Sequence, residues 1–284
     1  RRRRAGELLY SQSLLNEMFV GQTFYICDTC GVLFRATELD NAHPMTYFKR
    51  DNIELYYEDS GEDLPAVLLL APGGMKSSIA FWDKAPWDPR DALKGEFRVI
   101  AMDQRNAGNS RAPVSGNDGW HSYTADQLAL MDHLSIDRFH AVGMCIGGPY
   151  CMGLIAAAPA RVISATLLQT IGLHENRDKF FLMFDSWAAN LKPTMAQVVE
   201  QDWVQFRENM YGNDEVLFTV GTEFLSACSV PLMVFKGDDD YHPSSASELI
   251  RDLCSSVVYV ENWKSGSDIE KAMAAHKSFL MSVS

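Results

Sequence analysis

Short runs of consecutive apolar residues recur along the chain from about residue 45 onward. The first, Ala66–Ala71, reads AVLLLA and is followed directly by Pro-Gly-Gly. A run in which every position is apolar is typical of a strand buried on both faces of a parallel sheet. We therefore expect such a sheet. Its further strands are predicted at Phe97–Met102, Phe139–Met144, Ala165–Gln169, Pro231–Phe235 and Val257–Val260.

Other segments show different periods. Tyr47–Lys49 and Ile53–Glu58 alternate around an Asp-Asn turn, which predicts an antiparallel hairpin before the first buried strand. Apolar positions spaced three or four apart predict helices between most of the strands. They are expected at Tyr123–Leu134, Gly148–Ala158, Ser244–Leu253 and Ser267–Val283. Alternating strands and helices predict an α/β fold, with a mostly parallel sheet and helices on both of its faces.

One interval breaks this alternation. Residues 171–229 separate two predicted strands and carry helical patterns rich in Phe, Trp and Met, at Lys179–Leu191, Met195–Met210 and Asn213–Ala227. We expect this insertion to form a helical lid over the carboxyl edge of the sheet. Met45 opens a sequence that reads like the start of a domain. We therefore predict one domain over residues 45–284, preceded by an extension over residues 1–44.

Composition narrows the class of protein. The 284 residues carry a net charge of −12, which disfavours binding to phosphate backbones, so no nucleic-acid partner is expected. No apolar run approaches the roughly 18 residues of a membrane-spanning helix. Six cysteines, of which only Cys27 and Cys30 are paired in sequence, make no disulfide framework, and thirteen methionines suit a reducing compartment, so we expect a cytoplasmic protein. A small-molecule substrate is the partner that remains, and the oligomeric state is open.

Residues 143–148, Gly-Met-Cys-Ile-Gly-Gly, follow a predicted strand and open a predicted helix. A nucleophile flanked by glycines at such a turn is forced into a strained backbone conformation that holds its side chain above the sheet. Gly143 and Gly147 are needed because neighbouring backbone leaves no room for a Cβ. The positive end of the following helix would stabilise a thiolate at Cys145. A small buried thiol in a tight turn is the structural alternative.

With this turn, three other segments resemble motifs of the α/β-hydrolase fold family, each after a predicted strand. They are Pro72-Gly73-Gly74, Asp103–Ser110 and Gly237–Asp240. The family motif has Ser where this chain has Cys145. The resemblance implies that the N–H groups of Gly74 and Ile146 hold an oxyanion. It also implies that a substrate lies near Gly73, Met75 and Met144, with His121 as a further candidate for the pocket wall.

The histidine of the triad is missing from its usual place. The resemblance implies a His in the loop after the last strand, but residues 261–267 contain none. His242, next to the presumed acid loop, is the preferred substitute as base, and loop packing is its alternative role. His276 falls on the buried stripe of the last helix and is predicted to be structural. A cysteine acting without a full triad is a further possibility, because a thiol is partly ionised near neutral pH.

The acid has more than one candidate. Asp240 fits the family's G-x-x-D spacing and Asp239 lies beside it, while an acid only two residues from His242 would be awkwardly placed to orient that ring. We expect hydrolysis of a small ester, lactone or thioester. An acyltransferase or lyase on the same scaffold, or a non-catalytic binding protein, remains as an alternative.

The N-terminal extension carries an incomplete metal-binding pattern. Cys27, Cys30 and His43 resemble part of a zinc finger, but the fourth ligand is absent. Three ligands do not close a structural zinc site. We therefore expect neither a metal nor a cofactor.

Overall fold

A computed structural model describes residues 24–26, 33–35 and 46–283. The chain divides into two units, Arg1–Met45 and Thr46–Ser284. In the first unit, β1 (Phe24–Ile26) pairs antiparallel with β2 (Leu33–Arg35). The incomplete zinc-finger pattern of Cys27, Cys30 and His43 lies outside the described residues.

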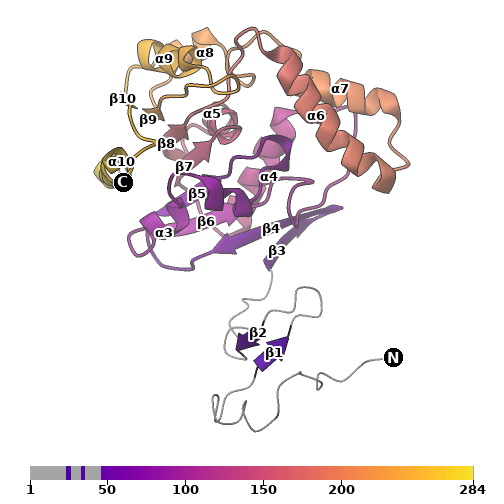
Figure 1. Ribbon diagram of the computed structural model, residues 1–284, viewed down its shortest axis with the longest axis horizontal. Helices are drawn as coiled ribbons and strands as arrows, with labels where there is room; N and C mark the ends of the chain where they lie inside the picture. Colours follow the sequence, from indigo (N-terminus) through magenta and orange to yellow (C-terminus); the bar gives the residue numbers. More distant parts are fainter. Residues whose placement is uncertain (1–23, 27–32, 36–45, 284) are drawn as a thin grey trace. The chain divides into compact units, whose positions relative to one another are not determined.

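The second unit is built on an eight-stranded sheet in the order β10-β9-β8-β7-β5-β6-β4-β3 (Figure 1). The first two strands form the predicted antiparallel hairpin, and β4 also pairs antiparallel with β6. All other neighbours are parallel. The mostly parallel sheet predicted from the apolar runs is therefore confirmed. The strands are β3 (Thr46–Arg50), β4 (Ile53–Asp59), β5 (Ala66–Leu70), β6 (Arg98–Met102), β7 (Phe139–Met144), β8 (Val162–Leu168), β9 (Leu232–Phe235) and β10 (Val257–Val260).

Both faces of the sheet are covered, which explains the uninterrupted apolar runs. Along β5, Ala66, Leu68 and Leu70 enter one core cluster. Val67 and Leu69 enter the other, because successive side chains of a strand point to opposite faces. The first cluster packs under α4 (Trp120–His133), α5 (Gly147–Ala157) and α9 (Ser244–Leu253), and the second under α3 (Pro89–Leu93) and α10 (Ser267–Ser282).

Three helices fill the interval between β8 and β9, and we call this segment the lid. They are α6 (Arg177–Leu191), α7 (Glu200–Tyr211) and α8 (Thr222–Ala227), and a short 3₁₀ turn, η3 (Lys192–Thr194), directly follows α6. Two further 3₁₀ turns, η1 (Gly74–Lys76) and η2 (Ile79–Lys84), lie between β5 and α3. The prediction of one helix over residues 213–227 is wrong for its first part. There the Asn213 side chain donates to the carbonyl of Phe218 at 2.8 Å, and Phe218 has φ +61°, so the backbone turns.

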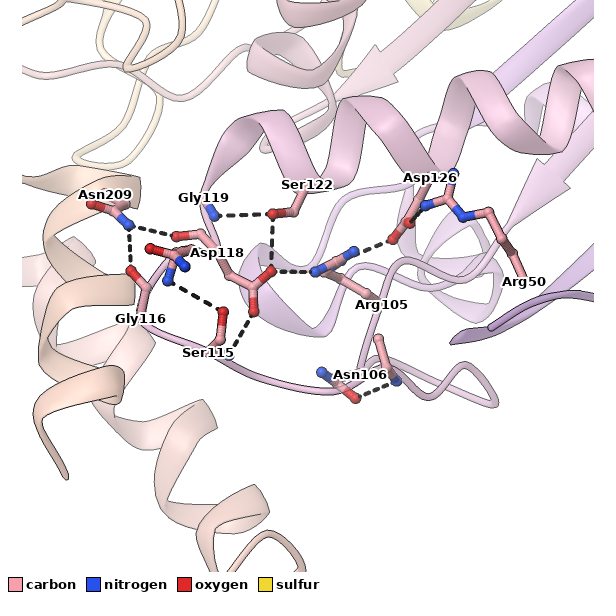
Figure 2. A network of polar contacts seen from close by, with 12 residues as sticks. Arg50, Arg105, Asn106, Ser115, Gly116, Asp118, Gly119, Ser122, Asp126 and Asn209 are labelled. Carbon is pink, nitrogen blue, oxygen red and sulfur yellow. Dashed lines mark hydrogen bonds and ion pairs between the residues drawn. The ribbon is translucent and has the colours of Figure 1, made fainter. Parts of the chain in front are cut away.

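An ionic network in the body, mostly buried, is hydrogen-bonded to the lid (Figure 2). Arg105, in the loop after β6, pairs with Asp118 at 2.6 Å and with Asp126 of α4 at 2.8 Å. Arg50 of β3 reaches Asp126 at 3.1 Å. On the lid side, Asn209 of α7 donates to the carbonyl of Asp118 at 2.8 Å. The charges of two arginines and two aspartates neutralise one another. The network therefore holds α7 of the lid through Asn209 without leaving an unpaired buried charge.

Replacing Arg105 should test this network. An Arg105→Met variant leaves Asp118 and Asp126 buried with their main partner removed, and we expect the free energy of unfolding to fall by about 3–5 kcal/mol. Lys49→Met removes an exposed pair with Glu54 and should cost less than about 1 kcal/mol. Urea titration followed by fluorescence measures both. Equal losses in the two variants would contradict the assigned role.

Candidate active site

Cys145 occupies a sharp turn between β7 and α5. Its backbone has φ +60°, an unusual value for a residue with a side chain. The turn is held by close backbone approach: a Cβ on Gly143 would lie 2.1 Å from the carbonyl oxygen of Gly147, and a Cβ on Gly147 would lie 2.2 Å from that of Leu70. Glycine is therefore required at both positions. The result is a half-buried cysteine at the carboxyl edge of the sheet.

The pKa of the Cys145 thiol is lowered. Desolvation by the surrounding protein acts in the opposite direction, but it is outweighed by His242 and by the backbone N–H groups of Gly73 and Ile146. Gly73 has φ +115°, and a Cβ there would lie 2.8 Å from the ring of Phe81. The loop after β5 therefore brings a backbone donor to the sulfur. The N–H that acts on the sulfur belongs to Gly73, whereas the sequence analysis named the next residue, Gly74, as a donor to an oxyanion, which stays a prediction.

His242 lies between Cys145 and an acid. Its Nδ1 is 2.8 Å from both carboxylate oxygens of Asp239. Its Nε2 is buried and makes no hydrogen bond at ordinary distance to any described residue, so this nitrogen is the one left for the thiol. Burial lowers the pKa of His242, but Cys145 and Asp239 together raise it above its usual value. A raised imidazole pKa beside a lowered thiol pKa favours a thiolate–imidazolium pair.

Asp239 is placed by the turn that also carries His242. One of its carboxylate oxygens accepts from the backbone N–H of Tyr241 at 2.9 Å and of His242 at 3.0 Å. These contacts, together with the imidazole, outweigh the effect of burial and lower the pKa of Asp239. An aspartate that bonds the backbone two or three residues ahead is a common turn former. Here it fixes the carboxylate against the ring.

The neighbouring Asp240 points elsewhere. Its exposed carboxylate forms an ion pair with Lys179 of α6. Its backbone carbonyl accepts from the Asn176 side chain at 2.7 Å. Of the two acids proposed from the sequence, the structure brings Asp239 to His242 and brings Asp240 to the lid. The His242 loop is thus tied directly to the start of α6.

The loop after β10 holds Trp263 in place of a histidine. This side chain is 2% exposed, and its Nε1 donates to the carbonyl of Lys236 at 2.9 Å. It packs edge-on against Trp87 and Phe235. Outside it lies a polar groove of about 260 Å³, lined in part by Asp238 and Lys264, which pair with each other. The groove's lining does not include Cys145.

The remaining predicted site residues separate into two groups. Met75 and Met144 are buried, at 1% and 6% exposure. Met75 directly follows the glycine pair, and its Sδ accepts a hydrogen bond from the hydroxyl of Tyr211 in the lid at 3.5 Å. His121, in contrast, lies exposed in the first turn of α4. His276 is buried in α10. Tyr211 had no motif to identify it, because a lid residue's position depends on the packing of the lid.

The elbow can be tested by adding one methyl group. In Gly147→Ala the new Cβ would clash with the Leu70 carbonyl, a backbone atom that cannot rotate away. We expect a loss of about 3 kcal/mol in the free energy of unfolding. Gly61→Ala is the matched control: its φ is +76° but nothing lies within 4 Å of the added Cβ, so only backbone strain of about 1 kcal/mol applies. Similar losses for the two variants would refute the clash.

The thiol–imidazole interaction predicts the pH dependence of alkylation. The rate of iodoacetamide labelling at Cys145, read from its peptide by mass spectrometry, should inflect below the free thiol pKa of about 8.5. His242→Gln should shift that inflection upward, because the residue that lowers the Cys145 pKa is lost. His174→Gln, at a histidine whose ring contacts Ser245, should not move it. A wild-type inflection at or above the free value would contradict the interaction.

Known proteins share this architecture. A family model described as alpha/beta hydrolase fold matches residues 66–227, more than half of the chain. The chain is 33% identical over 147 residues to the dihydrolipoyllysine-residue acetyltransferase component of the acetoin cleaving system of Pseudomonas putida, which covers 50% of this chain and 38% of that protein. It is 31% identical over 127 residues to rhodomycin D methylesterase of Streptomyces peucetius, covering 44% and 42%. The chain thus spans about two fifths of these relatives' lengths.

Among solved structures, the enol-lactonase of Burkholderia xenovorans superposes with a TM-score of 0.61 at 22% identity, covering 83% of this chain and all of that one. This likeness concerns the fold. None of the helices in the described part of the chain combines the length and apolar character needed to cross a membrane. The matched family model, together with the strand order and the turn at Cys145, shows that the chain belongs to the α/β-hydrolase fold family.

Proposed function

We propose that the protein is a hydrolase that cleaves a small carboxylic ester, lactone or thioester through Cys145. The observation that carries the proposal is the arrangement of Cys145, His242 and Asp239, in which one imidazole joins a carboxylate to an activated thiol. A nucleophile, a base and a group that orients the base are the parts that acyl transfer needs. The esterase among the relatives supports this class of reaction.

The chemistry follows from the protonation states. The Cys145 thiolate attacks the acyl carbon, and the N–H groups of Gly73 and Ile146 stabilise the oxyanion, an effect worth roughly 3–4 kcal/mol per donor in related sites. Protonated His242 then gives its Nε2 proton to the leaving alcohol or thiol. The neutral imidazole takes a proton from water, which attacks the acyl-cysteine and releases the acid. Throughout, Asp239 holds Nδ1–H and fixes the tautomer.

His242 can take the place of the histidine that the sequence motif lacks after β10. The loop after β10 packs Trp263 where the family pattern has its base, while the loop after β9 supplies both the acid and a base. This makes a degenerate, non-catalytic site the weaker hypothesis. Acyl transfer to an acceptor other than water uses the same first step, and it is distinguished by whether added thiols or amines divert the product.

Two adjacent aspartates give a sharp test. We expect Cys145→Ala to abolish turnover of activated esters and thioesters. Asp239→Asn should lower kcat/KM by roughly 100-fold or more, because the ring loses its orienting charge. Asp240→Asn, whose carboxylate pairs with Lys179, should stay within about threefold of wild type. An Asp240 variant that loses as much activity as the Asp239 variant would overturn the assignment of the acid.

A further inference from the structure

Two tyrosines inside the domain carry hydroxyl groups without partners. Tyr123 of α4 and Tyr150 of α5 are 0% and 1% exposed, and neither hydroxyl has a hydrogen-bond partner within the described residues. One turn after Tyr123, the Oε1 atom of the buried Gln127 also lacks a partner. Burying an unpaired hydroxyl costs about 1–3 kcal/mol, whereas phenylalanine would fill the same space without that cost. A polar group that bound beside these hydroxyls would remove that cost.

These side chains form one group with a residue of the lid. The rings of Tyr123 and Tyr150 stack at 5.1 Å. Trp120 contacts the ring of Tyr150 at 5.5 Å and that of Tyr211 at 5.7 Å. We call Tyr123, Tyr150 and Tyr211 the tyrosine cluster. It joins α4 and α5 of the body to the end of α7 in the lid.

The tyrosine cluster lies near the candidate nucleophile. Tyr150 sits in the first turns of α5, the helix that begins at the Cys145 elbow. The hydroxyl of Tyr211 contacts Met75, two residues after the Gly73 that faces the sulfur. Burial raises the pKa of both phenols, and the negative charge of Cys145 raises each of them further. The tyrosine cluster thus adjoins both segments that surround Cys145: Tyr150 lies in the helix that follows the elbow, and Tyr211 contacts the loop after β5.

The charges around the tyrosine cluster select a neutral ligand group. The Arg105 guanidinium lies 5.7 Å from the Tyr123 ring, but it is already paired with Asp118 and Asp126. An anionic ligand group would find no uncompensated positive charge there, and it would be repelled by a thiolate at Cys145. Phenol hydroxyls both donate and accept, so they suit a ketone, hydroxyl or ether oxygen.

We infer that the hydroxyls of Tyr123 and Tyr150 bind an uncharged oxygen group of the substrate, distinct from the carbonyl that is cleaved. The substrate is then an ester or thioester that carries a ketone, hydroxyl or ether oxygen, rather than a plain hydrocarbon chain or a second acid. This inference rests on the proposed reaction at Cys145. It assigns a specificity role to residues that no sequence motif marks.

Matched substrates test the inference. Pairs of activated thioesters and esters, identical except that one CH₂ is replaced by an oxygen or a C=O, are compared by kcat/KM. The replacement is placed at successive positions, in the acyl part in one series and in the alcohol part in another. We expect the oxygen-bearing member to be preferred about tenfold in at least one series, the gain that hydrogen bonds to neutral groups provide. Equal rates throughout both series would overturn the inference.

Variants separate recognition from packing. Tyr123→Phe and Tyr150→Phe should each reduce the preference about five- to tenfold, measured as the ratio of kcat/KM for the two members of each pair in the same variant. Because the lost hydroxyls have no partners in the free protein, Tm should stay level or rise. Tyr259→Phe is the control: its hydroxyl also lacks a partner, but it lies in β10, where its ring stacks against Arg251. The Tyr259→Phe variant should change neither the preference for the oxygen-bearing substrate nor the position of the oxygen at which that preference appears.

The outcomes also distinguish the two proposals. Turnover that survives in Cys145→Ala overturns the reaction at Cys145, whatever the tyrosine variants do. Turnover that requires Cys145 but shows the same preference in wild type and both Phe variants overturns only the substrate inference. A fall in Tm with an unchanged preference assigns the hydroxyls to internal structure, for example through buried water, and likewise overturns it.

Discussion

The candidate site depends on the contact between α5 and the end of β5, where Gly147 lies directly against the Leu70 carbonyl. This approach lets the chain reverse within a few residues, and the reversal gives Cys145 its positive φ. Ile146, the residue before the first turn of α5, then presents its N–H, while the loop after β5 presents that of Gly73. Two neighbouring strands thus deliver a thiol and its donors to one point on the sheet edge.

The loop after β9 adds the remaining groups in one compact turn. Asp239 bonds both the backbone and the ring of His242, so the carboxylate and the imidazole are positioned by the same four residues. A carbonyl in this turn also approaches Gly237 closely: a Cβ there would lie 2.3 Å from the oxygen of His242. Because this turn is self-contained, it can hold a base without help from the loop after β10. The loop after β10 can therefore place Trp263 in the hydrophobic core.

Most of the fold could be predicted from the sequence because the apolar runs of the central strands indicate burial on both faces, and that signal is local to each strand. The run at Val257–Val260 also forms a strand, although it is only half-buried at the edge of the sheet. The turn at Cys145 could also be predicted from nearby residues, because the spacing of the flanking glycines fixes it. Which of Asp239 and Asp240 lies against His242 could not be predicted from local sequence. It depends on contacts of Asp240 with Lys179 and Asn176 of the lid. The tyrosine cluster was equally hidden, since Tyr123, Tyr150 and Tyr211 meet only after three helices pack.

The same ties have a consequence for the geometry around the thiol. Lys179 and Asn176 bind the Asp240 end of the turn, and Gly172 donates to the carbonyl of Tyr241 at 3.3 Å. The turn that holds the His242 ring is therefore anchored to α6 and to the segment before it. A substitution that shifts the start of α6 would move the imidazole as well, so the lid contributes to the arrangement of groups at the nucleophile.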